Sequence, residues 1–136
     1  MVDPNDLPEH MRACPIEVAV GYIGKKWAVN IVRDLFVGKK RFSQFLHSNP
    51  DLSTKMLSTR LKELEKEGFI TKKVVSTNPI YIEYTLTTKG RALNGILLEL
   101  SMFSFRYCPS EVYRRPPITL ERDIALMKQV LKVGSK

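Results

Sequence analysis

The residues of this chain best suited to contact a polyanion lie at helical spacing in one short segment. Lys55, Thr59 and Lys62 recur at steps of three and four residues, with Ser58 beside them and Lys66 one turn further on. At about 100° per residue these positions share one face of a helix. Their ammonium and hydroxyl groups can donate hydrogen bonds to base edges and phosphates. The pattern favours a helix that enters a nucleic-acid groove, with an ordinary solvated helix face as the alternative.

No catalytic or metal-binding arrangement accompanies this basic face. His10 and His47 belong to no recognised metal-ligand motif, and the sequence has no Gly-rich phosphate loop or nucleophile elbow. Asp3, Asp6 and Glu9 resemble an acidic arm rather than a catalytic pair. We therefore expect no enzyme activity, no metal site and no other cofactor.

The sequence from Ser53 to Glu67 predicts the helix that presents the basic face. Ser53 can cap its first turn, and Gly68 can end it. An inner apolar stripe lies opposite the lysines, made of Leu57, Leu61 and Leu64.

Two β-type segments follow this helix. Residues 69–76 hold β-branched residues around Lys72 and Lys73, and the next segment alternates in polarity from Ile80 to Leu86. Pro79 cannot donate a ladder hydrogen bond, so it belongs at the tip of a hairpin. A helix followed by a hairpin predicts a winged helix-turn-helix, a mainly α fold with a small β-hairpin wing.

Further helices are expected on both sides of this unit. Their predicted ranges are 15–24, 27–38, a short helix capped by Ser43, a long helix from Thr87 or Thr88, and a last helix over 119–131, with a loop over 109–117. The flanking helices carry more apolar residues than one small domain needs to cover. We expect the N- and C-terminal helices to form a dimer interface, with packing inside one chain as the alternative.

The positive charge of the chain is concentrated where the predicted reader helix and wing lie. Residues 25–91 hold 14 Lys or Arg against 6 Asp or Glu, and the remaining residues hold eight of each. The net charge of +8 therefore belongs to that segment. This distribution favours double-stranded DNA as partner. A winged-helix adaptor that binds only proteins is the alternative, but it has no reason to confine its excess charge in this way.

Length and composition fit one folded, soluble domain. The chain has 136 residues, of which 43% are hydrophobic and 26% charged. No apolar run approaches the roughly 18 residues that span a bilayer. The acidic N-terminal residues differ from a secretion signal, so we expect a cytoplasmic protein with no membrane partner.

A series of short motifs, in the same order along the chain, resembles the HxlR-type regulators. These are winged helix-turn-helix repressors and activators of bacteria and archaea, related to the MarR group. The likeness runs from Cys14 to about Tyr107 and rests on Cys14-Pro15, Ile23-Gly24, Lys26-Trp27, Arg41-Phe42-Ser43, Lys55-Met56-Leu57, Arg60-Leu61, Leu64-Glu65, Gly68, Pro79, Glu83-Tyr84, Leu86-Thr87 and Gly90. The resemblance implies a homodimer on a near-palindromic operator, read by the Ser53–Glu67 helix. It also implies that Cys14 could sense an oxidant or another small-molecule effector.

Two features depart from the family pattern. Tyr81 stands before Ile82 where such proteins often have Arg or Lys, so Lys72 and Lys73 would supply the charge of the wing. Residues 108–136 extend beyond the shared pattern. We expect a flexible arm over 1–13, a DNA-binding domain with dimerisation helices over 14–107, and a C-terminal loop plus helix over 108–136.

Together these patterns predict a sequence-specific transcriptional regulator. The expected DNA contacts are Arg41, Lys55, Ser58, Thr59, Lys62, Lys72 and Lys73. Lys55, Thr59 and Lys62 would read base edges, and the others would hold phosphates. Arg60 lies beside the leucine stripe and could brace the helix instead.

Cys14 and Cys108 are the candidate redox residues. Arg12 and Arg106 each lie two residues from one of the thiols and would favour the reactive thiolate. Because Cys108 ends a predicted dimer helix, a Cys14–Cys108 bridge between subunits could form. Two inert, partly buried thiols are the alternative, and two cysteines are too few for a disulfide scaffold.

Overall fold

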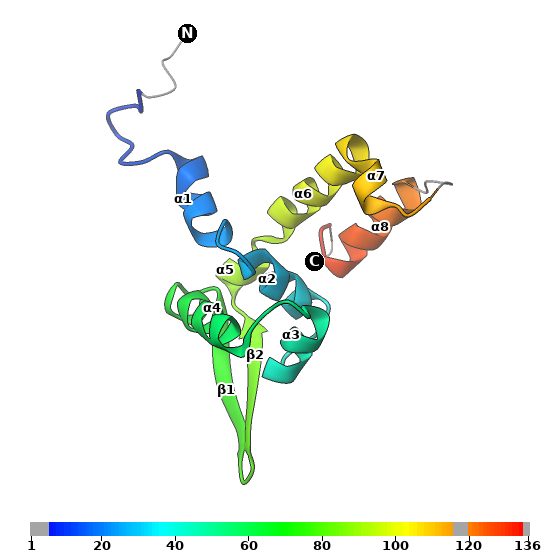
Figure 1. Ribbon diagram of the computed structural model, residues 1–136. Helices are drawn as coiled ribbons and strands as arrows, with labels where there is room; N and C mark the ends of the chain where they lie inside the picture. Colours follow the sequence, from blue (N-terminus) through cyan, green and yellow to red (C-terminus); the bar gives the residue numbers. More distant parts are fainter. Residues whose placement is uncertain (1–5, 116–119, 135–136) are drawn as a thin grey trace.

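The computed structural model describes residues 6–115 and 120–134, and these residues build a helical protein around one two-stranded sheet (Figure 1). Residues 6–13 form no helix or strand. The elements are α1 (Pro15–Ile23), α2 (Ala28–Phe36), α3 (Phe42–Ser48), α4 (Thr54–Lys66), β1 (Ile70–Thr77), β2 (Ile80–Leu86), α5 (Thr88–Arg91), α6 (Asn94–Tyr107), α7 (Pro109–Val112) and α8 (Leu120–Val130). The predicted winged helix-turn-helix is confirmed: α3 and α4 are followed by an antiparallel hairpin.

Helix α4 begins and ends where its sequence predicts. The Ser53 Oγ accepts a hydrogen bond of 3.1 Å from the backbone N–H three residues on, which caps the first turn. At the other end Gly68 has φ +85°, a left-handed conformation that lets the chain leave the helix sharply. The side chains that face the core are at most 2% exposed, and they are Leu57, Leu61 and Leu64.

The C-terminal end of α4 is fastened to the chain that leaves the wing. The Thr87 hydroxyl donates to the Gly68 carbonyl at 2.6 Å and accepts from the Gly90 N–H at 3.0 Å. The Lys89 ammonium donates to the carbonyl of Glu67 at 2.7 Å, where a cation also complements the helix dipole. A Cβ at Gly90 would lie 2.1 Å from a backbone oxygen of the α4–β1 turn, so this close approach requires glycine.

The wing is anchored at its base and free at its tip. Tyr84 donates its backbone N–H to the Lys40 carbonyl at 2.8 Å, and its ring meets Phe45 edge-on at 6.3 Å between centroids. Burial raises the pKa of the Tyr84 hydroxyl, with Glu65 adding to the effect. The predicted inward alternation therefore holds at Tyr84 but fails at Ile80, which is 72% exposed. The hairpin extends past α3 and α4, so no other described element covers its far end (Figure 1).

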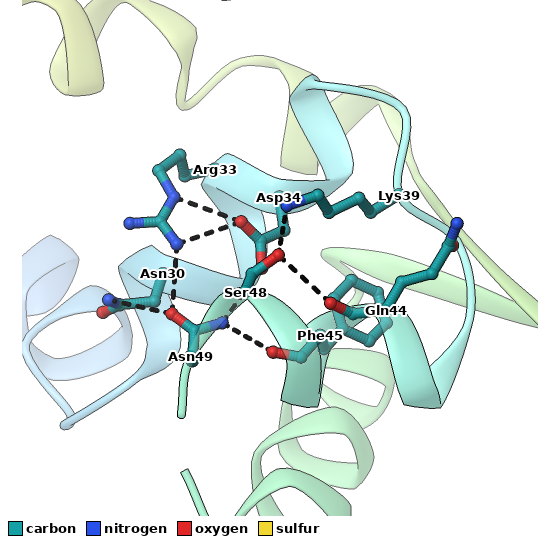
Figure 2. A network of polar contacts seen from close by, with 8 residues as sticks. All are labelled: Asn30, Arg33, Asp34, Lys39, Gln44, Phe45, Ser48 and Asn49. Carbon is teal, nitrogen blue, oxygen red and sulfur yellow. Dashed lines mark hydrogen bonds and ion pairs between the residues drawn. The ribbon is translucent and has the colours of Figure 1, made fainter. Parts of the chain in front are cut away.

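A buried polar network joins α2 to the end of α3 (Figure 2). Asp34 and Asn49 are 1% and 4% exposed, and the Asn49 Nδ2 donates to the Asp34 Oδ2 at 3.0 Å. The same Nδ2 donates to the Phe45 carbonyl at 2.8 Å. Arg33 donates to the other carboxylate oxygen at 3.0 and 3.2 Å and to the Asn49 Oδ1 at 3.1 Å. Sequence patterns did not predict this network.

Helix α3 starts at Phe42, two residues earlier than a cap at Ser43 predicts. Ser43 does not cap it, because the Gln44 Oε1 reaches back and accepts from the N–H groups of Lys40 and Arg41 at 2.9 and 3.0 Å. At the far end of the helix the Lys39 ammonium donates to the Ser48 hydroxyl (Figure 2).

The C-terminal part differs from prediction in two ways. The long helix expected from Thr87 or Thr88 is divided, with a turn between α5 and α6. The expected loop over 109–117 contains the short helix α7, and its last two residues lie outside the described part of the chain, as does the predicted helix start at Thr119. Helix α8 contacts α6 of the same chain, and Leu131, just after α8, is only 1% exposed. The expected part of α8 in a dimer interface stays a prediction.

Two helices nevertheless present apolar side chains to solvent in the described chain. On α1, Ile16 is 73% exposed and Val20 is 52% exposed. On α6, Phe103 is 60% and Tyr107 is 75% exposed. The two helices project on the side opposite the hairpin tip and diverge from each other (Figure 1).

Removing the Asn49 amide should cost far more stability than removing a peripheral amide of the same network. Asn49→Ala leaves the buried Asp34 carboxylate short of a donor, so we expect the free energy of unfolding to fall by about 3 kcal/mol in urea. Asn30→Ala is the matched control, because its bond to Asn49 is long at 3.4 Å. Its loss should stay below about 1 kcal/mol. Equal losses in the two variants would contradict the assigned role of the Asp34–Asn49 pair.

Candidate nucleic-acid interface

The outward face of α4 is polar, basic and exposed, as predicted. Lys55, Thr59 and Lys62 are exposed and Ser58 is half-buried. The Thr59 hydroxyl donates to the Lys55 carbonyl at 3.0 Å, so its oxygen lone pairs and its methyl group remain for an outside partner. Lys66 continues the same face and is also exposed.

The carboxylates of α4 are held at its flank by other cations. Lys25 lies 3.6 Å from Glu63 and 3.5 Å from Glu67, measured between ammonium nitrogen and carboxylate oxygen. Arg60 donates to Glu63 at 3.0 Å and to the Lys26 carbonyl at 2.8 Å. Arg60 thus braces α4 against the α1–α2 turn. Since Glu63 and Glu67 are already paired, they do not neutralise the outward lysines.

The structure separates the cations of residues 25–91 into two groups. Six take part in side-chain contacts that hold the fold, namely Lys25, Arg33, Lys39, Arg60, Lys89 and Arg91. The other eight make no ion pair or side-chain hydrogen bond with the described residues, namely Lys26, Lys40, Arg41, Lys55, Lys62, Lys66, Lys72 and Lys73. All eight are exposed. Most of the second group lies on the start of α3, on α4 and on the wing.

Arg41 contacts the wing through Tyr81, the residue that stands where related proteins often have Arg or Lys. Its guanidinium carbon lies 3.9 Å from the centroid of the Tyr81 ring, a stacked cation–π contact. Tyr81 has no charge of its own, but its ring holds the Arg41 guanidinium, from the residue before α3, against β2. The site therefore retains an arginine beside the wing, supplied by a different element. This pairing was not predictable from residue spacing, because Arg41 and Tyr81 belong to different elements.

The two wing lysines face opposite sides of the hairpin. Lys72 pairs across the ladder with Tyr84, and Lys73 pairs with Glu83. Because directly opposed residues share a face, Lys73 stands beside a carboxylate while Lys72 stands beside a buried aromatic ring. Both lysine side chains are exposed. Lys40, adjacent to Arg41, is an exposed cation of this region that the sequence-based selection omitted.

The two cysteines are free and half-buried, and they lie at helix ends. Cys14 immediately precedes α1, and Cys108 lies between α6 and α7. Each therefore lies at an end of a helix that exposes apolar side chains. Among the described residues there is no cluster of three or more His, Cys, Asp or Glu side chains that could hold a metal ion. Within the same residues, no helix is both long and apolar enough to cross a bilayer.

Comparison with known proteins identifies the architecture. The model of the HxlR-like helix-turn-helix family matches residues 22–112. The chain is 46% identical over 92 residues to YvaP, an uncharacterised HTH-type transcriptional regulator of Bacillus subtilis, covering 67% of this chain and 85% of YvaP. It is 38% identical over 96 residues to the HTH-type transcriptional regulator YodB of the same organism, covering 70% of this chain and 86% of YodB.

Solved structures agree with this result. The reduced form of YodB superposes with a TM-score of 0.63 at 37% identity, covering 71% of this chain and 95% of YodB. The redox regulator HypR in its reduced form superposes with a TM-score of 0.67 at 33% identity, covering 74% of this chain and all of HypR. YodB has further been solved after diamide treatment and with a bound quinone.

Proposed function

The chain belongs to the HxlR-like helix-turn-helix family of transcriptional regulators, and we propose that it acts as a homodimer on a near-palindromic operator. The observation that carries this proposal is the exposed basic face of α4, whose lysines have no partner among the described residues while Glu63 and Glu67 are paired with other cations. Two such helices related by a twofold axis would enter successive major grooves about 34 Å apart.

Each part of the interface has a distinct role in this proposal. Lys55, Thr59 and Lys62 read base edges from the major groove, and the free lone pairs and methyl of Thr59 suit acceptance from a base amine or contact with a thymine methyl. Ser58, which is half-buried at the edge of this face, contacts the sugar-phosphate backbone of the DNA. Arg41, held on Tyr81, and the wing lysines Lys72 and Lys73 bind phosphates.

Substituting lysines of different elements should separate base reading from phosphate binding. Lys62→Ala should weaken operator binding and relax base preference, at a cost of about 1–3 kcal/mol. Lys72→Ala should weaken all duplexes alike and lower the salt slope by about one. Mobility shifts with the DNA upstream of the protein's own gene, at several salt concentrations, measure both effects.

Lys128→Ala provides the matched control, since Lys128 is an exposed lysine on α8. It should leave DNA affinity unchanged. If the wild-type dimer neutralises about 6–10 phosphates, log K falls against log salt with a slope of roughly −5 to −9. A nearly flat salt response would favour a protein-interaction module instead.

The dimer would form through the apolar faces of α1 and α6. Ile16 and Val20 on α1 face solvent, as do Phe103 and Tyr107 on α6, and burying such side chains contributes about 1.5–3 kcal/mol each. A groove of about 720 Å³ lies between these helices and has Val18 and Ile96 among its lining residues. This supports a second copy seated there, with α8 engaged in its own subunit.

A charge on the exposed face of α6 should separate the subunits. Phe103→Glu is expected to convert the dimer to monomer in sedimentation experiments at micromolar concentration, because a carboxylate would be buried at the interface. Glu99→Gln, an exposed position on the same helix, is the control and should remain dimeric. A dimeric Phe103→Glu protein would exclude this face.

We further propose that Cys14 responds to oxidants or electrophiles. The support comes from the redox regulator HypR and from YodB, which was solved after diamide treatment and with a quinone. Cys14 precedes α1 and Cys108 follows α6, so both thiols lie at the ends of the proposed dimer helices. Oxidation would join them across the interface and change the spacing of the two α4 helices.

Diamide or hydrogen peroxide should change the operator affinity of the wild-type protein, and Cys14→Ser should abolish that change. Non-reducing electrophoresis should show a linked dimer that either Cys14→Ser or Cys108→Ser eliminates. An undiminished response of Cys14→Ser to diamide would end the sensor proposal. A response that survives only in Cys108→Ser would retain Cys14 as sensor and reject the bridge.

A further inference from the structure

A second, separate cavity of about 330 Å³ lies between α2, α6 and α8, on the other side of α6 from the groove described above. Its walls are mainly apolar and include Val29 of α2, Phe105 of α6 and Met127 of α8. Its volume lies within the range of about 300–1,000 Å³ that is usual for small-molecule sites. Helix α8 lies beyond the residues that match the family, so this cavity depends on a part of the chain that the family model does not describe.

The wall that α8 contributes is held in place by specific contacts. Leu131 is 1% exposed and also lines the cavity. The Tyr113 hydroxyl donates to the Asp123 carboxylate at 2.7 Å, which ties the chain after α7 to α8. Desolvation and this hydrogen bond raise the pKa of Tyr113 to about 12, so the tie persists at neutral pH. The cavity is thus built from fixed elements.

Arg33 is the one charged residue among those lining the cavity, all of which are described. Three of its five N–H groups are used, because Nε and Nη2 donate to Asp34 and Nη2 also donates to Asn49. Nη1 makes no hydrogen bond with the described residues, and the side chain is 44% exposed. A guanidinium with two uncommitted donors beside apolar walls is suited to an anion with an apolar body.

We propose that this cavity binds a small apolar carboxylate, with its hydrocarbon body between α2, α6 and α8 and its carboxylate accepting from Arg33 Nη1. A charged acceptor is favoured over a neutral one because charge-assisted bonds are roughly twice as strong as neutral ones. Arg33 also donates to Asn49 at the end of α3. The occupant would therefore contact the same side chain that helps to fix the turn leading into α4.

Binding can be measured without DNA, so the result is independent of the proposed operator binding. The probes are cinnamate and its neutral counterpart cinnamamide. Each is titrated into the full chain, whose methionine methyl groups are isotope-labelled, and the methyl signals are followed by NMR. The Met127 methyl should shift with saturation, whereas the Met56 methyl on α4 should not. Cinnamate should bind about tenfold more tightly than cinnamamide.

Two variants locate the site. Arg33→Gln should remove the preference for cinnamate while leaving the affinity for cinnamamide unchanged. Ser104→Trp, placed in the cavity wall, should abolish binding of both probes, and Ser110→Trp, an exposed serine on α7 outside the cavity, should retain it. Equal affinities for the two probes in the wild-type protein would overturn the role of Arg33. An absent Met127 shift, or one that persists in Ser104→Trp, would overturn the cavity as the site.

Discussion

The position of α4, the proposed reader helix, depends on a buried carboxylate that needs hydrogen-bond donors. Asp34 is almost wholly enclosed, and the Asn49 amide that serves it lies at the residue where α3 ends. A buried charge without its donors is costly, so the distance between α2 and the end of α3 is tightly constrained. The chain has only four residues between Asn49 and the start of α4, and Leu52 within them is itself buried. A polar contact in the core thus sets the direction in which the lysines of α4 point.

The cations of this chain have two different roles: some hold the fold together, and others face solvent without a partner among the described residues. Lys25, Arg60 and Lys89 are used to hold α4: two pair with its carboxylates and one satisfies its C-terminal carbonyl. By occupying Glu63 and Glu67, these inner cations leave the outward lysines uncompensated. Net charge alone does not distinguish the two groups, since every Lys or Arg adds one positive charge to the total whichever group it belongs to. The positive electrostatic field at the outward face of α4 therefore depends on Lys25 and Arg60, which neutralise Glu63 and Glu67 at the flank of the helix.

The sequence predicted those features that depend on neighbours along the chain. The Ser53 cap, the Gly68 stop, the leucine stripe of α4 and the hairpin at Pro79 all follow from contacts within a few residues. The Asp34–Asn49 pair joins residues 15 apart, and three elements lie between Arg41 and Tyr81 in the sequence, so the periodicity of the chain indicates neither contact. Amphipathicity shows that one face of α8 is covered without showing what covers it, so the part of α8 in a dimer interface stays a prediction beside its contacts with α6 of the same chain. The roles of the predicted DNA contacts belong to the complex and stay predictions.

The arrangement of the elements separates two surfaces that a regulator must connect. The unpaired lysines lie on α4 and the wing, and the exposed apolar side chains lie on α1 and α6, which project on the opposite side (Figure 1). A change at one surface reaches the other only through the elements between them, chiefly α2 and α5. Helix α5 contacts the C-terminal end of α4 through Lys89, and α2 contacts the approach to its N-terminal end through the Arg33–Asp34–Asn49 network. Both ends of α4 are held by elements that also adjoin α6, so in the proposed dimer a shift in how the two subunits meet would move α4 as a unit instead of bending it.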